Sequence, residues 1–302
     1  AELLRQAVVR RSVPQSVIFA GPEGVGKRAM AIALAQAVNC PDPRNGDACG
    51  ECPTCRRIER GDHFDVVLVT NEDGAATIKI EQVREVIDRA QYRPFEGRRR
   101  VVIVDEADAM VPQAQNALLK TLEEPPGTTR FVLTTDAVHH LLPTLRSRCQ
   151  SHALQMPTTQ EAHAWLAEQG IPSEQVEVLW RASGGRPSWV LDRFKQEGMT
   201  AQAWSQWPRQ LAKGQAGLLA TLPAAEGLAC LQKLCHDLLA IAVGGPAQFF
   251  RAEDLPKTPS ATKAAQWAQE LKDMTRHVEH PYNAALQLQA WTVRARQAMR
   301  PD

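Results

Sequence analysis

Short apolar runs alternate with amphipathic segments through the first half of the chain, and this alternation is the strongest structural signal in the sequence. The apolar runs cover residues 17–20, 64–69, 101–104 and 130–135, followed by a weaker one near 152–155. Between them, the segment 77–90 carries Val83, Val86 and Ala90 at helical spacing. Strands that are apolar on both faces are typical of parallel sheets covered by helices. The pattern therefore predicts an α/β domain with a parallel sheet over residues 1–156.

The second half of the chain lacks strand signals and is predicted to be helical. Helices are expected at 159–169, 173–183, 187–196, 200–213, 224–243, 260–278 and 281–299, with a Pro-rich linker at 246–259. In the last helix Leu288, Trp291 and Ala295 share one stripe, which indicates the core of a helical bundle. We therefore predict a small helical domain at 157–198 and a larger all-α domain at 199–302.

Composition and charge narrow the class of protein. Of the 302 residues, 44% are hydrophobic and 23% are charged, as in ordinary folded globular proteins. The formal net charge of +1 excludes a broadly basic nucleic-acid-binding surface and leaves a local basic face open. No apolar run approaches the roughly 20 residues that span a bilayer, and charged residues interrupt the start of the sequence. We expect a cytoplasmic protein that makes no contact with a membrane.

A glycine-rich loop lies between the first apolar run and the first long helical segment. Residues 20–28 read A-G-P-E-G-V-G-K-R, so Gly21, Gly26 and Lys27 match the phosphate-binding pattern G-x-x-x-x-G-K. Gly24 adds backbone freedom, so that N–H groups can surround a phosphate while Lys27 reaches its terminal oxygens. The next position normally carries Ser or Thr as a Mg²⁺ ligand, and here it is Arg28. The loop is complete except for its metal ligand.

An acidic pair follows the third apolar run, as in phosphate-loop ATPases. Asp105 is placed to hold Mg²⁺ and Glu106 to polarise an attacking water. Thr134 and Thr135 end the fourth run, and the carboxyl ends of parallel strands are where ligands bind in open α/β sheets. Strand ends often carry solvated carboxylates, but an acidic pair about 80 residues after a glycine loop predicts a nucleotide site.

Arg28 leaves two interpretations of this site open. Nucleotide could still bind, without a properly held Mg²⁺. Alternatively, Lys27 and Arg28 could pair with Asp105 and fill the pocket themselves. ATP or ADP binding is thus expected to be weak or absent, and a role for Mg²⁺ is doubtful.

Four cysteines are clustered directly after the first long helix. Cys40, Cys49, Cys52 and Cys55 have the spacing C-x8-C-x2-C-x2-C in a stretch rich in Pro, Gly, Asp and Arg. Each C-x2-C turn aims two sulfurs at one point, and four thiolates satisfy tetrahedral Zn²⁺. Unrelated surface thiols are the less favoured interpretation. The pattern predicts a structural zinc module at 40–55, closed to catalysis because sulfur fills every position.

These motifs together resemble the bacterial clamp-loader AAA+ subunits. The resemblance rests on the cysteines between the glycine loop and the acidic strand, on N-A-L-L-K-T-L-E-E-P-P at 116–126, and on S-R-C at 147–149. It covers roughly residues 13–190. It implies that residues 1–156 form an AAA+ P-loop domain, that 157–198 form a lid, and that 199–302 form a collar that joins the subunits of a ring.

The departure at Arg28 indicates which kind of clamp-loader subunit the chain resembles. The family includes the gamma/tau motor, with an intact loop, and the delta-prime subunit, whose loop is often degenerate and which acts as the rigid member, or stator. The resemblance to delta-prime implies no ATPase activity of its own within the DNA polymerase III holoenzyme. Arg148 would act as an arginine finger in trans on a neighbouring ATPase subunit. Implied partners are gamma/tau and delta subunits, the sliding clamp, and primed DNA through the complex.

Two other functions fit parts of the sequence. A gamma/tau-like motor would hydrolyse ATP despite Arg28, with Glu106 essential. A zinc-ribbon module that binds nucleic acid would use the zinc site and the run Arg98-Arg99-Arg100, although that run is expected to be a solvated turn. A sensor role for Arg186, in G-G-R-P-S, is not carried over from the motor.

Overall fold

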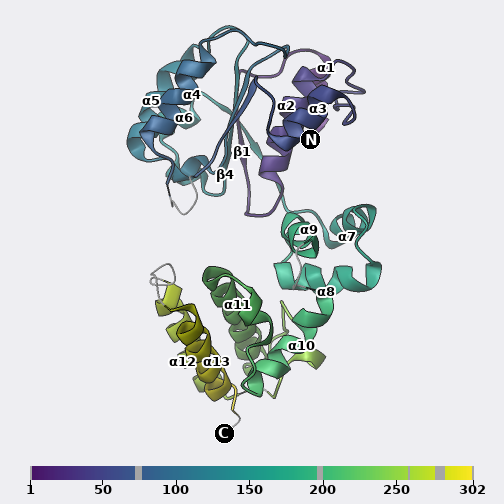
Figure 1. Cartoon of the computed structure of the whole chain (residues 1–302), viewed down its shortest axis with the longest axis vertical. Helices are drawn as coiled ribbons and strands as arrows, with labels where there is room; N and C mark the ends of the chain where they lie inside the picture. The colour runs from purple at the N-terminus through teal and green to yellow at the C-terminus, as the bar shows by residue number, and fades with distance from the viewer. Residues whose placement is uncertain (1, 72–76, 196–199, 258, 276–282, 301–302) are drawn as a thin grey trace. The chain divides into compact units, whose positions relative to one another are not determined.

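The computed structural model describes residues 2–71, 77–195, 200–257, 259–275 and 283–300 (Figure 1). They form two compact units, Ala1–Met156 and Pro157–Asp302. Residues 276–278 of the predicted helix 260–278 and residues 281–282 of the predicted helix 281–299 lie outside the described residues.

The first unit is built on a five-stranded sheet with parallel strands in the order β2-β3-β4-β1-β5. The strands are β1 (Ser16–Ala20), β2 (Val66–Val69), β3 (Val101–Val104), β4 (Arg130–Thr135) and β5 (Gln150–Ala153). Val101 lies opposite Arg130, and Phe19 lies opposite Thr134. Parallel neighbours cannot be joined by tight turns, so every connection crosses over a face of the sheet. The predicted α/β domain with a parallel sheet is confirmed.

Helices cover both faces of this sheet (Figure 1). One face carries α1 (Glu2–Val9), α2 (Lys27–Asn39) and α3 (Pro53–Arg60), and the other carries α4 (Ile80–Ala90), α5 (Pro112–Glu123) and α6 (Pro143–Arg146). Successive residues of a strand point to opposite faces. Phe19 therefore packs toward α2 and Leu34, whereas Ile18 packs toward α5 and Leu118. Two cores result, one on each side of the sheet.

Local structure departs from the sequence patterns in the cysteine-rich stretch and at the start of the second strand. Residues 53–60 form a helix inside the cysteine-rich stretch, where turns were expected, with the Cys52 side chain capping its first turn. The second strand begins at Val66 rather than at residue 64, and Phe64 is 62% exposed. The reason is Asp65, whose fully buried carboxylate binds a distant loop.

The second unit is helical, as predicted. Its helices are α7 (Thr159–Glu168), α8 (Ser173–Ser183), α9 (Pro187–Lys195), α10 (Ala201–Ala212), α11 (Ala224–Ala242), α12 (Ala261–Thr275) and α13 (Ala284–Ala298). Short 3₁₀ turns complete the chain: η1 (Ala107–Ala109), η2 (Val138–His140), η3 (Gly217–Thr221) and η4 (Ala252–Asp254). Within the described ranges, no helix combines the length and the apolar character needed to cross a bilayer.

Aromatic side chains form the centre of the second unit. Trp204 stacks on Phe250 with ring centroids 4.5 Å apart, and Trp207 lies beside both. The buried cluster around them extends from Leu166 to Met299, so the predicted lid (157–198) and collar (199–302) share one core. The division between these two domains stays a prediction.

The expected linker at 246–259 is fixed to the core of the second unit. The buried Asp237 carboxylate accepts hydrogen bonds of 2.8–2.9 Å from the backbone N–H groups of Gln248, Phe249 and Phe250. A Pro-rich composition indicated a connector, but these three bonds and the buried Phe250 make the segment part of the folded unit.

The Asp65 carboxylate performs the same task in the first unit. It accepts hydrogen bonds from the N–H groups of Phe95, Glu96 and Gly97 at 2.7–2.8 Å, and from Arg100 Nη2 at 3.0 Å. Arg100 is buried, so the run 98–100 is not the fully solvated turn that was expected. Burial alone would raise the pKa of Asp65, but the N–H groups and the Arg100 guanidinium outweigh it and lower the pKa to about 2.

Replacement of Asp65 by Asn should destabilise the first unit by about 3 kcal/mol, because it leaves Arg100 buried without its charge partner. The lowered pKa also predicts a pH dependence. Asp65 binds a proton more weakly in the folded chain than in the unfolded chain. Its carboxylate therefore adds about 2 kcal/mol to the free energy of unfolding above pH 4, and this contribution is lost as the pH falls toward 2. Urea unfolding at pH 3 and pH 7 tests both statements. Asp88→Asn, an exposed carboxylate on α4, is the control, and equal stability of the two variants would contradict the prediction.

Candidate nucleotide and metal sites

The glycine loop joins β1 to α2 at the carboxyl edge of the sheet. Gly24 and Gly26 have φ angles of 77° and 95°, a region that favours glycine. A Cβ added at Gly21 would lie 2.5 Å from the carbonyl oxygen of Leu154, so the loop passes too close to the chain after β5 for any side chain. The sequence thus builds the expected phosphate-loop turn, with α2 beginning at Lys27.

Lys27 is buried and directed at its own loop. Its Nζ donates hydrogen bonds to the carbonyl oxygens of Gly21 and Pro22, both at 2.9 Å, and it forms an ion pair with Asp136. An ammonium group has three N–H donors, and these three acceptors use all of them. Asp136 follows Thr135 at the end of β4 and was missed in the sequence. The available signal was a carboxylate at the carboxyl end of a strand, next to the two predicted threonines.

Arg28 and Asp105 form the other charge pair at this edge. Arg28 Nη1 lies 3.6 Å from Asp105 Oδ2, and the Thr134 hydroxyl donates a hydrogen bond of 2.6 Å to Asp105 Oδ1. Of the two expected pairings with Asp105, the structure has the one from Arg28, while Lys27 pairs with Asp136 instead. Thr135 Oγ1 accepts from the N–H of Ala137 at 3.1 Å and so fixes the turn after β4.

Glu106 follows Asp105 at this edge of the sheet and has an unusual backbone conformation. Its φ is 52°, in the left-handed region, and its N–H donates to Thr134 Oγ1 at 3.0 Å. Burial, followed by the charges of Asp105 and Asp136, raises the pKa of Glu106. The structure therefore brings all the predicted nucleotide-site residues to one edge of the sheet: Gly21, Gly24, Gly26, Lys27, Arg28, Asp105, Glu106, Thr134 and Thr135.

The four predicted metal ligands also come together. The Sγ atoms of Cys40, Cys49, Cys52 and Cys55 lie within 4.8 Å of one another. Tetrahedral Zn²⁺ with Zn–S bonds of 2.3 Å separates its sulfurs by roughly 3.8 Å, and the Cys40–Cys49 distance is 3.5 Å. Backbone N–H groups of Cys49, Cys52 and Cys55 each point at a neighbouring sulfur at 3.4 Å. The donor set fits a closed thiolate site for one metal ion.

This cluster is joined to the rest of the unit on two sides. Gln36 on α2 donates to the carbonyl oxygen of Cys55 at 2.9 Å, and Arg5 on α1 pairs with Asp47 at 2.9 Å. Cys55 and Cys40 are buried, whereas the other two cysteines are partly exposed. A metal ion here would connect the end of α2 to the start of α3.

Arg148 lies elsewhere, after α6. Its Nε donates to Glu123 Oε1 at 2.6 Å, Nη2 pairs with the same carboxylate, and Nη1 donates to the carbonyl oxygen of Thr144 at 2.6 Å. Glu123 ends α5, in the stretch whose sequence carried the family resemblance. The Arg148 side chain remains 29% exposed, so its guanidinium is held in place near the surface.

A glycine loop after β1, an Asp-Glu pair after β3 and a parallel sheet of this order define an α/β protein of the P-loop class. The sequence model of a protein family described as "DNA polymerase III, delta subunit" matches residues 1–158. The chain belongs to this family.

Individual relatives agree with this assignment. The DNA polymerase III subunit delta' of Pseudomonas aeruginosa is 36% identical over 211 residues, which make up 69% of this chain and 62% of that protein. The subunit tau/gamma of Haemophilus influenzae is 37% identical over 64% of this chain and 28% of that protein. The match thus spans less than two thirds of the length of either relative.

A solved structure shows a similar fold over the whole chain. It is a gamma subunit-related protein of DNA polymerase III from Thermotoga maritima, with a TM-score of 0.57 and 19% sequence identity. The two chains are covered to 99% each. At this identity the likeness concerns the fold alone.

The cysteine cluster gives a direct test. The purified chain should hold one Zn²⁺, and Cys52→Ser should lose it together with more than about 2 kcal/mol of the stability of the first unit, because one thiolate is removed from a closed site. Metal content by atomic emission and chemical unfolding are the measurements. Cys149→Ser, outside the cluster, should keep the metal. A zinc-free chain of unchanged stability would contradict the assignment.

Proposed function

We propose that the chain is a delta-prime-type subunit of a bacterial clamp loader, which helps to load the sliding clamp onto primed DNA without hydrolysing ATP itself. The observation that carries this proposal is the state of Lys27, whose three donors are all bound within the chain. Family membership supplies the setting, because the relatives at 36–37% identity are named as subunits of DNA polymerase III.

The glycine loop supports a weak or absent nucleotide site. For a phosphate to bind, Lys27 must leave Asp136 and two carbonyl oxygens, and the phosphate must then approach the carboxylate of Asp136. Arg28 replaces the hydroxyl that would hold Mg²⁺ and places a cation beside Asp105. A divalent ion would thus meet a positive charge where it needs an oxygen ligand. The loop keeps its shape but lacks the hydroxyl that would hold Mg²⁺, and its lysine is already paired.

Arg148 is the residue through which the chain would act on ATP. An arginine supplied by a neighbour stabilises charge on the transferring phosphoryl group and accelerates transfer by about 10³–10⁵-fold in related systems. Glu123 and the Thr144 carbonyl hold the Arg148 guanidinium at the surface in the free chain. We infer that the terminal phosphate of ATP bound to a gamma/tau subunit competes with Glu123 for this guanidinium when the ring assembles.

The remaining parts have structural roles in this proposal. Zn²⁺ on the four cysteines would fix the segment between α2 and α3. Residues 157–198 would serve as the lid, and residues 199–302 as the collar that contacts the delta and gamma/tau subunits. The sliding clamp and primed DNA are partners of the assembled complex.

The isolated chain should show no Mg²⁺-dependent ATP hydrolysis, and any ATP binding should be weak and indifferent to Mg²⁺. The reason is that Arg28 replaces the hydroxyl that would bind Mg²⁺, and Asp136 pairs with the lysine that would bind phosphate. Equilibrium binding and phosphate release with and without Mg²⁺ measure this. Clear turnover that Glu106→Gln abolishes would replace the proposal with the gamma/tau-like motor. Asp136→Asn is the informative variant, since release of Lys27 should tighten ATP binding by about tenfold.

Arg148→Ala should leave the chain folded and able to join the complex, yet slow ATP turnover and clamp loading by the reconstituted complex by at least about tenfold. The loss is expected in the active site of a neighbouring gamma/tau subunit. It should therefore appear only in the assembled complex. Turnover with primed DNA and sliding clamp, at saturating ATP, is the measurement.

Arg146→Ala provides the matched control, because Arg146 is an exposed arginine two residues earlier. It should turn over ATP at the normal rate. Unchanged turnover in the Arg148→Ala complex would remove the arginine finger from the proposal while leaving family membership intact.

A further inference from the structure

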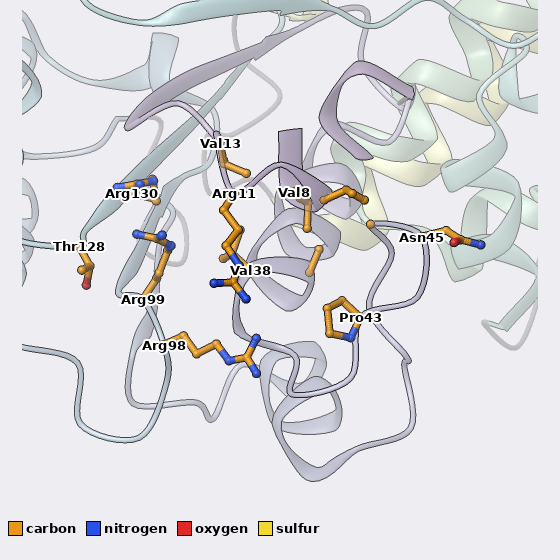
Figure 2. A pocket seen from close by; sticks show the side chains of 13 residues that line it. Val8, Arg11, Val13, Val38, Pro43, Asn45, Arg98, Arg99, Thr128 and Arg130 are labelled. Atoms are coloured by element: carbon orange, nitrogen blue, oxygen red, sulfur yellow. The ribbon is translucent and has the colours of Figure 1, made fainter. Parts of the chain in front are cut away.

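A cavity of about 570 Å³ opens at the amino edge of the sheet, at the opposite ends of the strands from the glycine loop. It lies where β1, β3 and β4 begin, between the end of α1 and the segment after α2 (Figure 2). Strands of four to six residues rise about 3.3 Å per residue, so this cavity is roughly 15 Å or more from Lys27. It is a separate site.

Arginine dominates the polar part of the cavity wall. Four of its 13 lining residues are Arg11, Arg98, Arg99 and Arg130, and none is acidic. In Figure 2 the guanidinium groups of Arg11 and Arg98 extend into the space between Thr128 and Pro43. The four arginines come from three separate segments of the chain. A protein with a net charge of only +1 thus gathers four positive charges around one hollow.

None of these four arginines has a carboxylate partner among the described residues. Arg28, Arg100 and Arg148 each pair with an Asp or Glu of this chain. Among the residues that the structure describes, no ion pair is formed by any of the four at the cavity. Like charges held close together without counter-charges repel one another, which an anionic ligand would relieve.

Arg11 has a backbone conformation that is unfavourable for residues other than glycine. Its φ is 54°, at the end of α1, where the N–H of Ser12 bonds to the carbonyl oxygen of Ala7 at 2.8 Å. This is the left-handed position after a helix, which glycine usually occupies. An arginine there costs stability, and it directs a charge at the cavity that glycine would not supply.

Arg130 adds a buried donor without a partner in the described part of the chain. Its Nε is buried and has no hydrogen-bond partner among the described residues. Burial, together with the charge of Arg99, lowers the pKa of Arg130. The Arg99 backbone is fixed by a hydrogen bond of 2.8 Å to Asn39, and Asp65 holds the turn that precedes it. The charged wall is therefore preorganised and incompletely satisfied.

The other wall of the cavity is aliphatic. Val8, Val13, Val38 and Pro43 line it, and no aromatic ring is present. Nucleic-acid sites that read bases stack them on aromatic side chains, so this wall does not fit a base-reading groove. Its volume suits a small ligand, and guanidinium forks match the oxygens of phosphate groups.

We propose that this cavity binds a phosphate-bearing ligand, in which two or three linked phosphoryl groups contact Arg11, Arg98, Arg99 and Arg130 and a sugar or apolar portion rests on Val8 and Val38. The same chemistry has two sources, a free polyphosphate or nucleotide and the 5′-phosphate end of a nucleic acid. The site lies outside the proposed clamp-loader role and does not depend on it.

The test is calorimetric titration of the 302-residue chain with sodium tripolyphosphate, with ATP, and with a short oligonucleotide carrying a 5′-phosphate or a 5′-hydroxyl. Arg99→Gln should weaken tripolyphosphate binding by about tenfold, the effect of one lost charge-assisted contact. Arg11→Gly should weaken it similarly while raising the melting temperature by about 2 °C, since the backbone strain is removed. Arg10→Gln, an exposed neighbour outside the cavity wall, is the charge-matched control. Each titration is repeated with Lys27→Met to remove any contribution of the glycine loop.

Tighter binding of the 5′-phosphate than of the 5′-hydroxyl oligonucleotide, lost in Arg99→Gln, would support the nucleic-acid source. Arg99-dependent binding of tripolyphosphate or ATP alone would support the free ligand. Absence of binding, or binding that Arg99→Gln and Arg10→Gln reduce equally, would overturn the proposal. So would binding of an oligoglutamate peptide with no measurable affinity for any of the phosphate probes.

Discussion

The first unit depends on one buried carboxylate. Asp65 lies just before β2, and through three backbone N–H groups it holds the turn at residues 95–97 that leads into β3. The side chain of Arg100 and the bond from Arg99 to Asn39 tie the same turn to α4 and α2. One charged group thereby sets where β3 begins. It also fixes two of the arginines that line the cavity at the amino edge.

Charge at the carboxyl edge is arranged differently. Two ion pairs lie where a phosphate-loop protein holds its ligand. One joins Lys27 to Asp136, and the other joins Arg28 to Asp105. The glycine φ angles fit the phosphate-loop pattern, while Lys27 and Arg28 each pair with a carboxylate of the same chain. In the proposed function the loop would keep its shape without its chemistry, since the shape is set by backbone and packing and the chemistry by a few side chains.

The sequence predicted well those features that depend on neighbouring residues. Apolar runs gave the parallel sheet, and the C-x2-C spacings gave the cluster of four cysteines, because two-residue separations already place sulfurs together. Contacts between distant segments were missed. Asp136 as the partner of Lys27, Glu123 as the partner of Arg148, and the burial of Arg100 each require knowledge of which strands and helices lie side by side. The arginine-lined cavity was unforeseen for the same reason.

The aromatic core of the second unit gives the two halves of the chain different optical properties. All seven tryptophans lie between residues 165 and 291, and several are packed around Trp204, Trp207 and Phe250. The first unit contains none. Intrinsic tryptophan emission from this protein therefore originates entirely in the helical unit. The sheet with its glycine loop and cysteine cluster emits no such signal, so tryptophan fluorescence follows the helical unit alone in a solution of the whole chain.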